Sequence, residues 1–493
     1  MQFLQTYKFF RNLILSLVAL SVIGFFFSYK ILEIPGGLTP DEASFGYNAV
    51  LLAETLHDQN KRFLPFFVLS SDGVDWRQPV TQYYLTAIFK IFGSSVFLLR
   101  FSSVIITLIS TILVFFLAKL LLGKYAAFLA SFLFLTTPLI MIQSHMGLDN
   151  IMPIPFVLLW MISLLQFQKK LNLKYLLLAG VFLGIGFYSY KGARAMVLVW
   201  FLLTVLYLKF AFNNSLKDFL KRVVIFVFGI FPFFAIVPIL EIKYAGAILG
   251  GTHPSFDSVY AFLYPYFSSF DPTFLFIKGD DLPIHSTGVH GMMLLASSPL
   301  FFIGCYQAIK KKNFWLFILA VFFLAPLLYG LIGSVHRASR LMAIVPLYAL
   351  LATLGGDFLW RSKIKNFIKG KIIFLVIIIL IFINYFDFVN YYWFTYPKFT
   401  HQSENTLKVF KAYRALAEQA KLKGLTPYLD TVVQDGDSGL FFEVIYFDQP
   451  IGRWMSKKDV LPTGSILLTP RREIPGLEKA NIDIPFRHLQ IYQ

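Results

Sequence analysis

Cysteine and charged residues are both scarce in this sequence. A single cysteine, Cys305, lies in an apolar run, so the chain cannot form an internal disulfide or a cysteine-ligated metal cluster. Only 14% of the 493 residues are charged, whereas a soluble globular chain usually carries about a quarter. Together with a hydrophobic content of 57%, this shortage excludes an ordinary set of soluble domains and predicts a membrane protein.

The basic residues are grouped in short clusters between the apolar runs. A formal net charge of +17 could indicate a nucleic-acid partner, but clusters at the ends of apolar runs are typical of the cytoplasmic ends of membrane helices. We therefore expect no nucleic-acid partner. The apolar stretch that follows Lys8 and Arg11 has no small-residue cleavage site and is long enough to span, which predicts a retained first helix rather than a removed signal peptide.

Long apolar runs repeat along most of the chain. Because a spanning helix needs about 20 mostly apolar residues, the sequence predicts about eleven spans. These begin near Leu13, Val96, Tyr125, Ile151, Leu176, Ala195, Val223, Met292, Phe314, Leu341 and Ile372. The fold class expected from this pattern is mostly α, a polytopic transmembrane helical protein.

The distribution of Lys and Arg predicts the orientation. If the N-terminus is cytoplasmic, every inner end holds a basic cluster and the outer loops hold fewer cations over longer segments, which is the positive-inside pattern. An odd number of spans then places the C-terminus outside. The inner clusters include Lys119 and Lys124, residues 169–174, residues 209–222, residues 310–312 and residues 361–371.

Three polar segments are expected outside the membrane. They are a first outer loop (residues 33–94), a second large outer loop (residues 241–290) and a C-terminal segment (residues 391–493) that follows the transmembrane domain (residues 1–390). In the C-terminal segment, Glu404–Lys421 has apolar residues at helical spacing, and the runs Leu440–Phe447 and Ser465–Leu468 are typical of strands. We therefore predict a small extracytoplasmic α/β domain there.

Two adjacent carboxylates, Asp41 and Glu42, lie early in the first outer loop. Such a pair can supply a general base or bind a cation. The alternative is a helix cap, because Asp41 follows Pro40 and acidic residues favour the first turn of a helix. The sequence alone leaves both interpretations open.

The same loop returns to the membrane with basic and aromatic residues. Arg77 lies in the segment Trp76–Tyr84, and Arg100 follows closely. A cation at a membrane surface can hold a phosphate, but it can equally anchor a helix end among lipid headgroups. Both roles stay open for Arg100.

The order of these segments resembles the first luminal loop of the GT-C glycosyltransferases. Pro40-Asp41-Glu42 with Tyr47 is followed by Arg77-Gln78-Pro79 with Tyr83-Tyr84, and then by Lys90–Gly93 with Arg100. The nearest relatives look like protein O-mannosyltransferases and the bacterial aminoarabinose transferases that modify lipid A. This chain has Arg77-Gln78-Pro79 where a Lys-Pro pair is usual, so its cation is displaced by one position. The resemblance covers about residues 10–390 and implies a GT-C fold.

The resemblance extends to later loops and assigns roles to further residues. Asp41 is expected to be the general base, with Glu42 orienting the acceptor or the loop. The donor phosphate is expected to bind the cations of three loops, namely Arg77, Lys191, Arg194, Arg337 and Arg340. The substrate and acceptor are expected to contact Tyr47, Tyr83, His145, Asp149 and Lys278. Each of these residues also has a simpler interpretation as a helix cap, a lipid anchor or a polar loop residue.

The chemistry implied is sugar transfer from a polyprenyl-phosphate donor in the membrane to an acceptor hydroxyl on a protein, lipid or glycan, with inversion at the anomeric carbon. A carboxylate takes the acceptor proton and cations stabilise the leaving phosphate, so no metal is required. A divalent cation shared by Asp41, Glu42 and Asp149 remains an alternative. The other functions left open are a transporter or flippase of lipid-linked precursors, a ligase for diphosphate-linked glycans, and a structural membrane protein.

Overall fold

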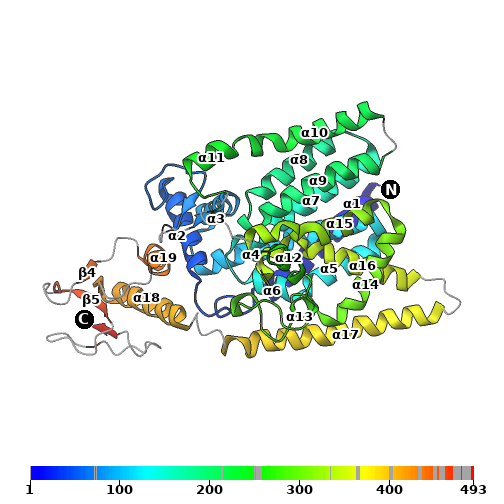
Figure 1. Ribbon diagram of the computed structural model, residues 1–493. Coiled ribbons are helices and arrows are strands. Elements are labelled where there is room, and N and C mark those ends of the chain that lie inside the picture. The colour runs from blue at the N-terminus through cyan, green and yellow to red at the C-terminus, as the bar shows by residue number, and fades with distance from the viewer. Residues whose placement is uncertain are drawn as a thin grey trace.

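The chain folds into a helical bundle with a small α/β segment at one end (Figure 1). A GT-C-like bundle of this kind is what the apolar runs predicted. The computed structural model describes residues 2–70, 73, 75–212, 215–248, 250, 258–333, 335–361, 367–398, 404–430, 436–447, 452–454, 461–469, 479 and 490–492.

A helix occurs at each of the predicted spans. The long helices and the short 3-10 helices that extend them are α1 (Gln2–Ser28), α4 (Val96–Leu122), α5 (Lys124–Leu135), α6 (Pro138–Ser144), η1 (Asp149–Ile151), α7 (Pro153–Lys170), α8 (Lys174–Phe187), η2 (Lys191–Ala193), α9 (Arg194–Phe210), α10 (Leu216–Ala235), α11 (Val237–Lys243), α14 (Ser298–Lys311), α15 (Asn313–Leu324), η5 (Ala325–Ile332), η6 (Ala338–Ile344), α16 (Val345–Arg361) and α17 (Phe367–Phe394).

Seven of these helical segments are long and apolar enough to cross a membrane by themselves. The count becomes eight if α5 and α6, which are bent by 62° at Thr136 and Thr137, form one span. The described part of α1 and the whole of α8 are apolar but shorter. The protein is therefore a multi-pass membrane protein, and the predicted total of about eleven spans stays a prediction.

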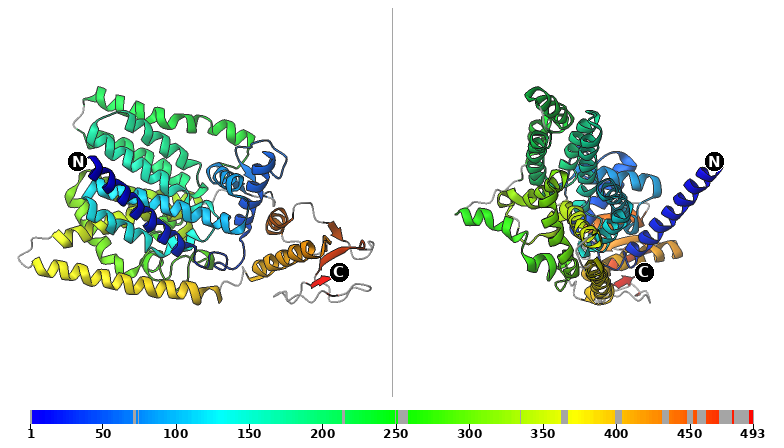
Figure 2. Two further views of the ribbon diagram at one scale, coloured as in Figure 1. Left: turned by 180° about the vertical axis from the view of Figure 1, so that it is seen from behind. Right: turned by 90° about the vertical axis from the view of Figure 1, so that its right-hand side faces the viewer.

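The two ends of the bundle differ in charge. At one end, here called the basic end, the last turns of α4, α7, α9, α14 and α16 carry Lys or Arg. Lys169 Nζ and Arg361 donate hydrogen bonds to the carbonyls of Leu120 and Leu122, so these helix ends lie together. Helix α1 begins near this end, and the C-terminal α/β segment lies at the opposite one, here called the head end (Figure 2).

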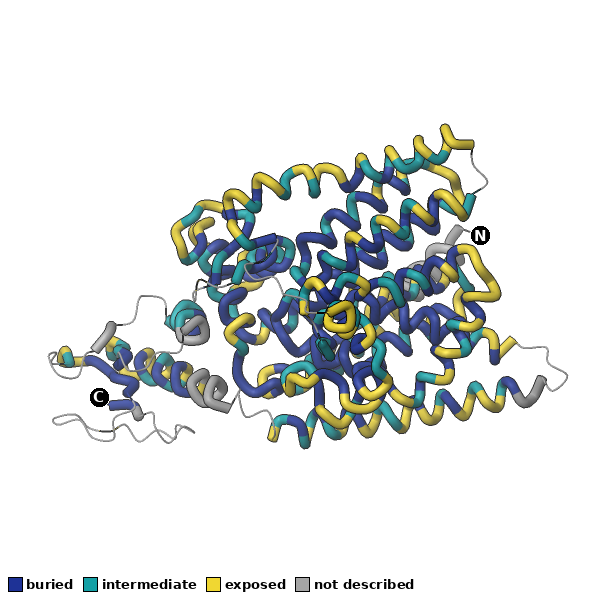
Figure 3. Tube along the Cα trace, in the orientation of Figure 1, coloured by how far each residue is buried: buried dark blue, intermediate teal, exposed yellow. Residues whose placement is uncertain are grey.

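Close helix packing holds the centre of the bundle. Helices α14 and α16 meet at Gly304 and Gly355, where a Cβ atom would lie 1.8 Å from the Leu351 carbonyl oxygen and 2.0 Å from that of Leu300. Small residues of this kind let helix backbones approach in a membrane, where burial of apolar surface alone gives little attraction. The buried residues fill the bundle centre, and the outward faces of α10 and α17 are largely exposed, as expected for lipid contact (Figure 3).

Short elements of the connecting loops cover the head end. Between α1 and α4 lie α2 (Pro40–Thr55), the antiparallel pair β1 (Val68–Leu69) and β2 (Trp76–Arg77), and α3 (Pro79–Phe92). Between α11 and α14 lie α12 (Val259–Ser268), α13 (Pro272–Phe276), η3 (Pro283–His285) and η4 (Leu295–Ser297). These are the two large loops that the sequence indicated.

The C-terminal segment is a small α/β unit. After η7 (Tyr396–Lys398) come α18 (Glu404–Lys423), β3 (Thr426–Asp430), α19 (Gly436–Tyr446), β4 (Gly452–Trp454), β5 (Ser465–Thr469) and β6 (Gln490–Tyr492). Strands β4, β3 and β5 are parallel, and β6 completes the order β4-β3-β5-β6 as an antiparallel edge. The helix and the strand Ser465–Leu468 were correctly predicted. The predicted strand Leu440–Phe447 was wrong, because this run forms most of α19 and buries Phe441 and Phe442 on one side.

Candidate active site

Helix α2 begins with a complete capping box. The Thr39 hydroxyl accepts a hydrogen bond from the Glu42 backbone, and the Glu42 carboxylate accepts one from the Thr39 backbone. This arrangement satisfies two backbone donors at the helix start. The cap therefore uses Thr39 and Glu42, and the carboxylate of Asp41 is left outside it.

Glu42 is fully buried and joins three parts of the head end. Its carboxylate lies 2.9 Å from the Arg100 Nε atom on α4 and accepts a hydrogen bond from the Gly147 backbone before η1. Arg100 is equally buried and donates to the carbonyls of Ile31, Pro35 and Gly37. This pair holds the chain between α1 and α2 against α4, so Arg100 is neither a headgroup anchor nor a free phosphate ligand.

Asp41, in contrast, is accessible and lies in a chain of alternating charges. Its side chain is 61% exposed, and its Oδ1 atom is 2.8 Å from Arg77 Nη1. Arg77 also lies 3.7 Å from Asp75, which in turn lies 3.0 Å from Lys191 Nζ. An accessible carboxylate beside buried and half-buried cations can accept a proton from a substrate hydroxyl.

Two contacts with α2 fix the orientation of the Arg77 side chain. Its Nε atom donates to the Ser44 hydroxyl at 3.0 Å, and its guanidinium lies over the Phe45 ring at 5.4 Å. The backbone of Arg77 is paired with Val68 in the short β1–β2 ladder. Arg77 is thus 6% exposed and aimed at the start of α2.

Three 3-10 helices bring further groups to the same place. Helix η6 packs against both η1 and η2. Asp149, at the start of η1, lies within electrostatic reach of Arg77, Asp41 and Asp75. Tyr190, just before η2, makes a side-chain hydrogen bond with Ser339 and senses the charges of Arg340 and Asp149. The structure therefore gathers Asp41, Arg77, Asp149, Lys191 and Arg340, which the sequence analysis named separately.

Arg340 differs from the other cations in its hydrogen bonding. Its Nη1 atom is buried and has no hydrogen-bond partner among the described residues. A buried guanidinium N–H without a partner is costly, and an anionic ligand would supply one. Arg340 therefore has the donor capacity to bind a phosphate.

Arg194 has a different environment. Its guanidinium donates to the Ala247 and Ile248 carbonyls, to the Phe187 carbonyl and to the Gln78 amide oxygen. These bonds use its donors to fix the segment after α11 against η2 and β2. Its observed contacts are thus with the protein itself.

Arg337 belongs to a separate acidic contact. Its Nη1 atom lies 3.5 Å from Asp280, which also accepts a hydrogen bond from the Ala338 backbone. The preceding His336 lies 3.3 Å from Asp271 and 3.5 Å from Asp281. The loop that leads into η6 is therefore held by the aspartates around α13, which places Arg340.

The remaining predicted substrate contacts lie in other settings. Tyr83 donates its hydroxyl proton to the Pro65 carbonyl, and Tyr47 is half-buried against the packing of α2. His145 is fully buried beside Tyr392, and burial, with the Arg100 charge, lowers the pKa of its ring to about 3. Lys278 is exposed at the end of α13. None of the four is placed in the Asp41–Arg77 cluster by a printed contact among the described residues.

Asp75 and Tyr190 were missed by the sequence analysis. Asp75 precedes Trp76-Arg77 and links Arg77 to Lys191. Its only signal was its place beside a motif already noted. Within the described part of the chain, no group of three His, Cys, Asp or Glu side chains lies close enough to hold a metal ion. Glu42 is bonded to Arg100, so it does not join Asp41 and Asp149 in such a group.

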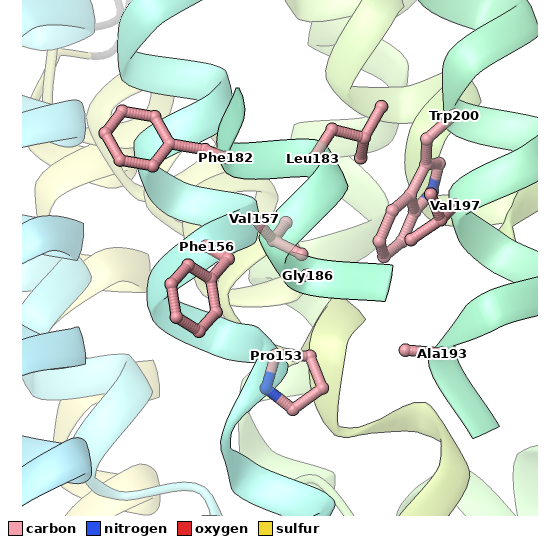
Figure 4. Close-up of a pocket in the computed structure, with 9 residues that line it drawn as sticks. All are labelled: Pro153, Phe156, Val157, Phe182, Leu183, Gly186, Ala193, Val197 and Trp200. Carbon is pink, nitrogen blue, oxygen red and sulfur yellow. The ribbon is translucent and has the colours of Figure 1, made fainter. Parts of the chain in front are cut away.

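An apolar crevice lies below the charged cluster (Figure 4). It has about 200 Å³ of unfilled space between α7, α8 and α9, and its walls are purely apolar. Its upper rim includes Ala193, which lies between Lys191 and Arg194 in sequence, and Pro153, which follows η1. The lining residues are Pro153, Phe156, Val157, Phe182, Leu183, Gly186, Ala193, Val197 and Trp200. A lipid tail is the chemistry that such walls suit.

His285 gives the head end a pH-dependent stability. Burial, with the Arg337 charge, lowers the pKa of His285 to about 4. Its neutral Nδ1 atom lies 2.8 Å from Gln143 Nε2, which can only donate, so protonation of Nδ1 breaks this bond. Because the folded pKa lies below the ordinary value of 6.5, the stabilisation is present at neutral pH and is lost as pH falls from 6.5 toward about 4.

We expect the thermal unfolding midpoint of the detergent-solubilised protein to fall more between pH of about 7.5 and about 5 than that of the His285→Gln variant. The glutamine keeps a hydrogen-bonding group that does not titrate. Equal declines in the two proteins would show that His285 carries no such role.

A bundle of membrane helices whose head-end loops gather a carboxylate and several cations has the architecture of the GT-C glycosyltransferases. This confirms the resemblance stated for the first loop. Residues 77–240 match the family model described as dolichyl-phosphate-mannose-protein mannosyltransferase. No curated protein matches the chain in sequence.

Two solved structures of ArnT from Cupriavidus metallidurans share the fold over nearly the whole chain. The apo structure matches with a TM-score of 0.56 at 11% identity and covers 98% of each chain. The structure bound to undecaprenyl phosphate matches with a TM-score of 0.57 at 10% identity and covers 97% of each chain. At this identity the similarity establishes the fold.

Proposed function

We propose that this protein transfers a sugar from a polyprenyl-phosphate donor to an acceptor hydroxyl at the head end of the bundle. The observation that carries the proposal is the exposed Asp41 carboxylate 2.8 Å from Arg77, in a cluster that also holds Lys191, Asp149 and Arg340. A base for the acceptor and cations for the leaving group are the two requirements of this reaction.

The reaction uses the cluster as follows. The acceptor oxygen attacks C1 of the sugar as its proton passes to the Asp41 carboxylate. The bond from C1 to the phosphate oxygen breaks, and its electron pair leaves with the polyprenyl phosphate. Arg77, Lys191 and Arg340 stabilise the growing negative charge. Attack opposite the leaving phosphate inverts the anomeric carbon.

The donor's two parts fit two neighbouring features. Its phosphate would lie among the cations of β2, η2 and η6, and its apolar tail would extend toward the crevice below Ala193 and Pro153. The ArnT structure bound to undecaprenyl phosphate supports a polyprenyl phosphate as the ligand class. The matched family description supports the same class of donor. The acceptor class, whether protein, lipid or glycan, is left open.

The proposed orientation places the head end outside the cytoplasm. Its support is the gathering of Lys and Arg at the opposite end, as in the last turns of α4, α7 and α14. Such a charge difference sets the orientation of membrane proteins. The C-terminal α/β segment would then be extracytoplasmic, as the sequence analysis expected.

One observation favours the transporter alternative. Helices α5 and α6 form a span broken by 62°, and broken helices often line transport sites. The break carries no charged side chain, however, because neither helix has one after Lys124. Intramembrane transport sites for charged substrates usually contain such groups.

Purified protein in liposomes distinguishes the two functions. With a radiolabelled undecaprenyl-phosphate sugar as donor, we expect the label to move to an acceptor supplied as a membrane extract. Movement of the intact donor between leaflets, without transfer of the label, would favour the transporter and contradict the proposal.

The cations of η6 provide a matched pair for testing donor binding. We expect Arg340→Ala to weaken undecaprenyl phosphate binding by about tenfold or more, because a hydrogen bond to a charged group contributes about 1.5–3 kcal/mol. Arg337→Ala should have a smaller effect, since that guanidinium is paired with Asp280. Binding to protein in nanodiscs measures both. Unchanged binding in Arg340→Ala would assign this arginine to anchoring alone.

A further inference from the structure

The C-terminal segment contacts the helix that carries the proposed base. Helix α19 packs against α2, and the fully buried ring of Phe441 lies over Gly46. A Cβ atom at position 46 would lie 2.7 Å from the Phe441 Cζ atom, closer than such atoms pack. On its other side the ring stacks on Phe89 of α3, with centroids 6.4 Å apart and planes 7° apart.

This contact lies one helical turn from the reacting groups. Gly46 directly follows Ser44 and Phe45, the two residues that hold the Arg77 guanidinium. Asp41 lies in the first turn of the same helix and pairs with Arg77. A shift of α2 at Gly46 would therefore move both the proposed base and its cationic partner.

The opposite side of α2 is fixed by a different interaction. Glu42 is held by Arg100 of α4 and by the Gly147 backbone. Helix α2 is thus fixed from below by a buried ion pair and from above by an aromatic ring of the C-terminal segment. Two such contacts determine how deeply a short helix sits against its neighbours.

We propose that Phe441 is a positioning residue, through which the C-terminal segment sets the position of α2 and thereby the geometry of Asp41 and Arg77. The inference rests on the proposed function of that site. It gives the C-terminal segment a direct role in donor binding, as a part of the active-site support.

The glycine at position 46 supplies a specific test. Alanine favours a helix interior over glycine by about 1 kcal/mol, so Gly46→Ala should strengthen α2 by local preference alone. Any weaker ligand binding must then come from the collision with Phe441. Leucine at position 441 leaves room for the added methyl group, so it should relieve the collision.

The experiment measures undecaprenyl phosphate binding to the full chain in nanodiscs for four variants. We expect Gly46→Ala to weaken binding about fivefold and Phe441→Leu about threefold, as for residues in direct contact. The double variant Gly46→Ala/Phe441→Leu should bind within about twofold of the wild type, although independent effects would multiply.

Phe442 provides the matched control for this rescue. It is also fully buried on α19, but its ring contacts Tyr413 of α18 at 5.7 Å. Gly46→Ala/Phe442→Leu should remain as weak as Gly46→Ala. The thermal unfolding midpoint is recorded for each variant, so that binding is compared between equally folded proteins. If Gly46→Ala does not fold, Phe441→Leu tests the proposal by itself.

The outcomes separate this inference from the function on which it rests. Wild-type affinity in Phe441→Leu and Gly46→Ala, or equal rescue by Phe442→Leu, would overturn the positioning role and leave the proposed function intact. Failure of the wild type to bind undecaprenyl phosphate would overturn the proposed function.

Discussion

Replacing Asp41 with asparagine is expected to reduce sugar transfer by at least about a hundredfold, the effect usual for loss of a general base. The amide cannot accept the acceptor's proton, but it has nearly the same shape as the carboxylate. Undecaprenyl phosphate binding should be retained or tightened, because Asn removes a negative charge beside Arg77. Transfer of label from a radiolabelled undecaprenyl-phosphate sugar measures the first effect, and binding in nanodiscs measures the second.

Asp75 is the matched control for this substitution. It is also a partly exposed carboxylate near Arg77, at 3.7 Å, but its second partner is Lys191. Asp75→Asn should reduce transfer by only about fivefold, the effect of a disturbed ion pair. Full transfer by the Asp41→Asn protein would end the assignment of Asp41 as the base.

Replacing Glu42 with glutamine is expected to destabilise the folded protein. Glu42 is 0% exposed and Arg100 is 1% exposed, so the substitution leaves a buried guanidinium without its counter-charge. Breaking a buried pair in this way costs about 3–5 kcal/mol. We expect a lower thermal unfolding midpoint and a lower yield of monodisperse protein in detergent.

Glu54→Gln tests whether the effect depends on burial. Glu54 lies near the other end of α2 and is exposed, so its replacement should leave the unfolding midpoint nearly unchanged. A Glu42→Gln protein with normal stability but no transfer activity would contradict the structural role and make Glu42 a catalytic residue.

Much of the fold follows from local sequence features. Apolar runs of spanning length mark helices because a lipid environment requires backbone groups to pair within the segment. The basic clusters likewise marked one end of the bundle. The helix Glu404–Lys423 and the strand Ser465–Thr469 could be recognised from side-chain periodicity, since each buries one pattern of residues.

Tertiary contacts decided the features that the sequence could not. The run Leu440–Phe447 is short and apolar, and such runs fit a strand or a buried helix equally well. It becomes α19 because Phe441 meets Gly46, some four hundred positions earlier in the sequence, while Phe442 faces α18. No local periodicity contains that information.

The division of roles between neighbouring charges was equally hidden. Asp41 and Glu42 are adjacent, yet one is exposed beside Arg77 and the other is buried against Arg100. Arg194 and Arg340 both lie near the proposed site, but the donors of Arg194 bind backbone carbonyls 53 and 54 residues away. Only the folded geometry shows which of these cations keeps donors for a ligand.

The central claim is that one head-end cluster binds the donor phosphate beside Asp41. A cryo-electron-microscopy structure of the protein in nanodiscs with undecaprenyl phosphate tests it most directly. We predict the phosphate within hydrogen-bonding distance of Arg77 and Arg340, with the tail entering between α7 and α9. A phosphate bound at the basic end, or at the head end but away from both arginines, would contradict the account.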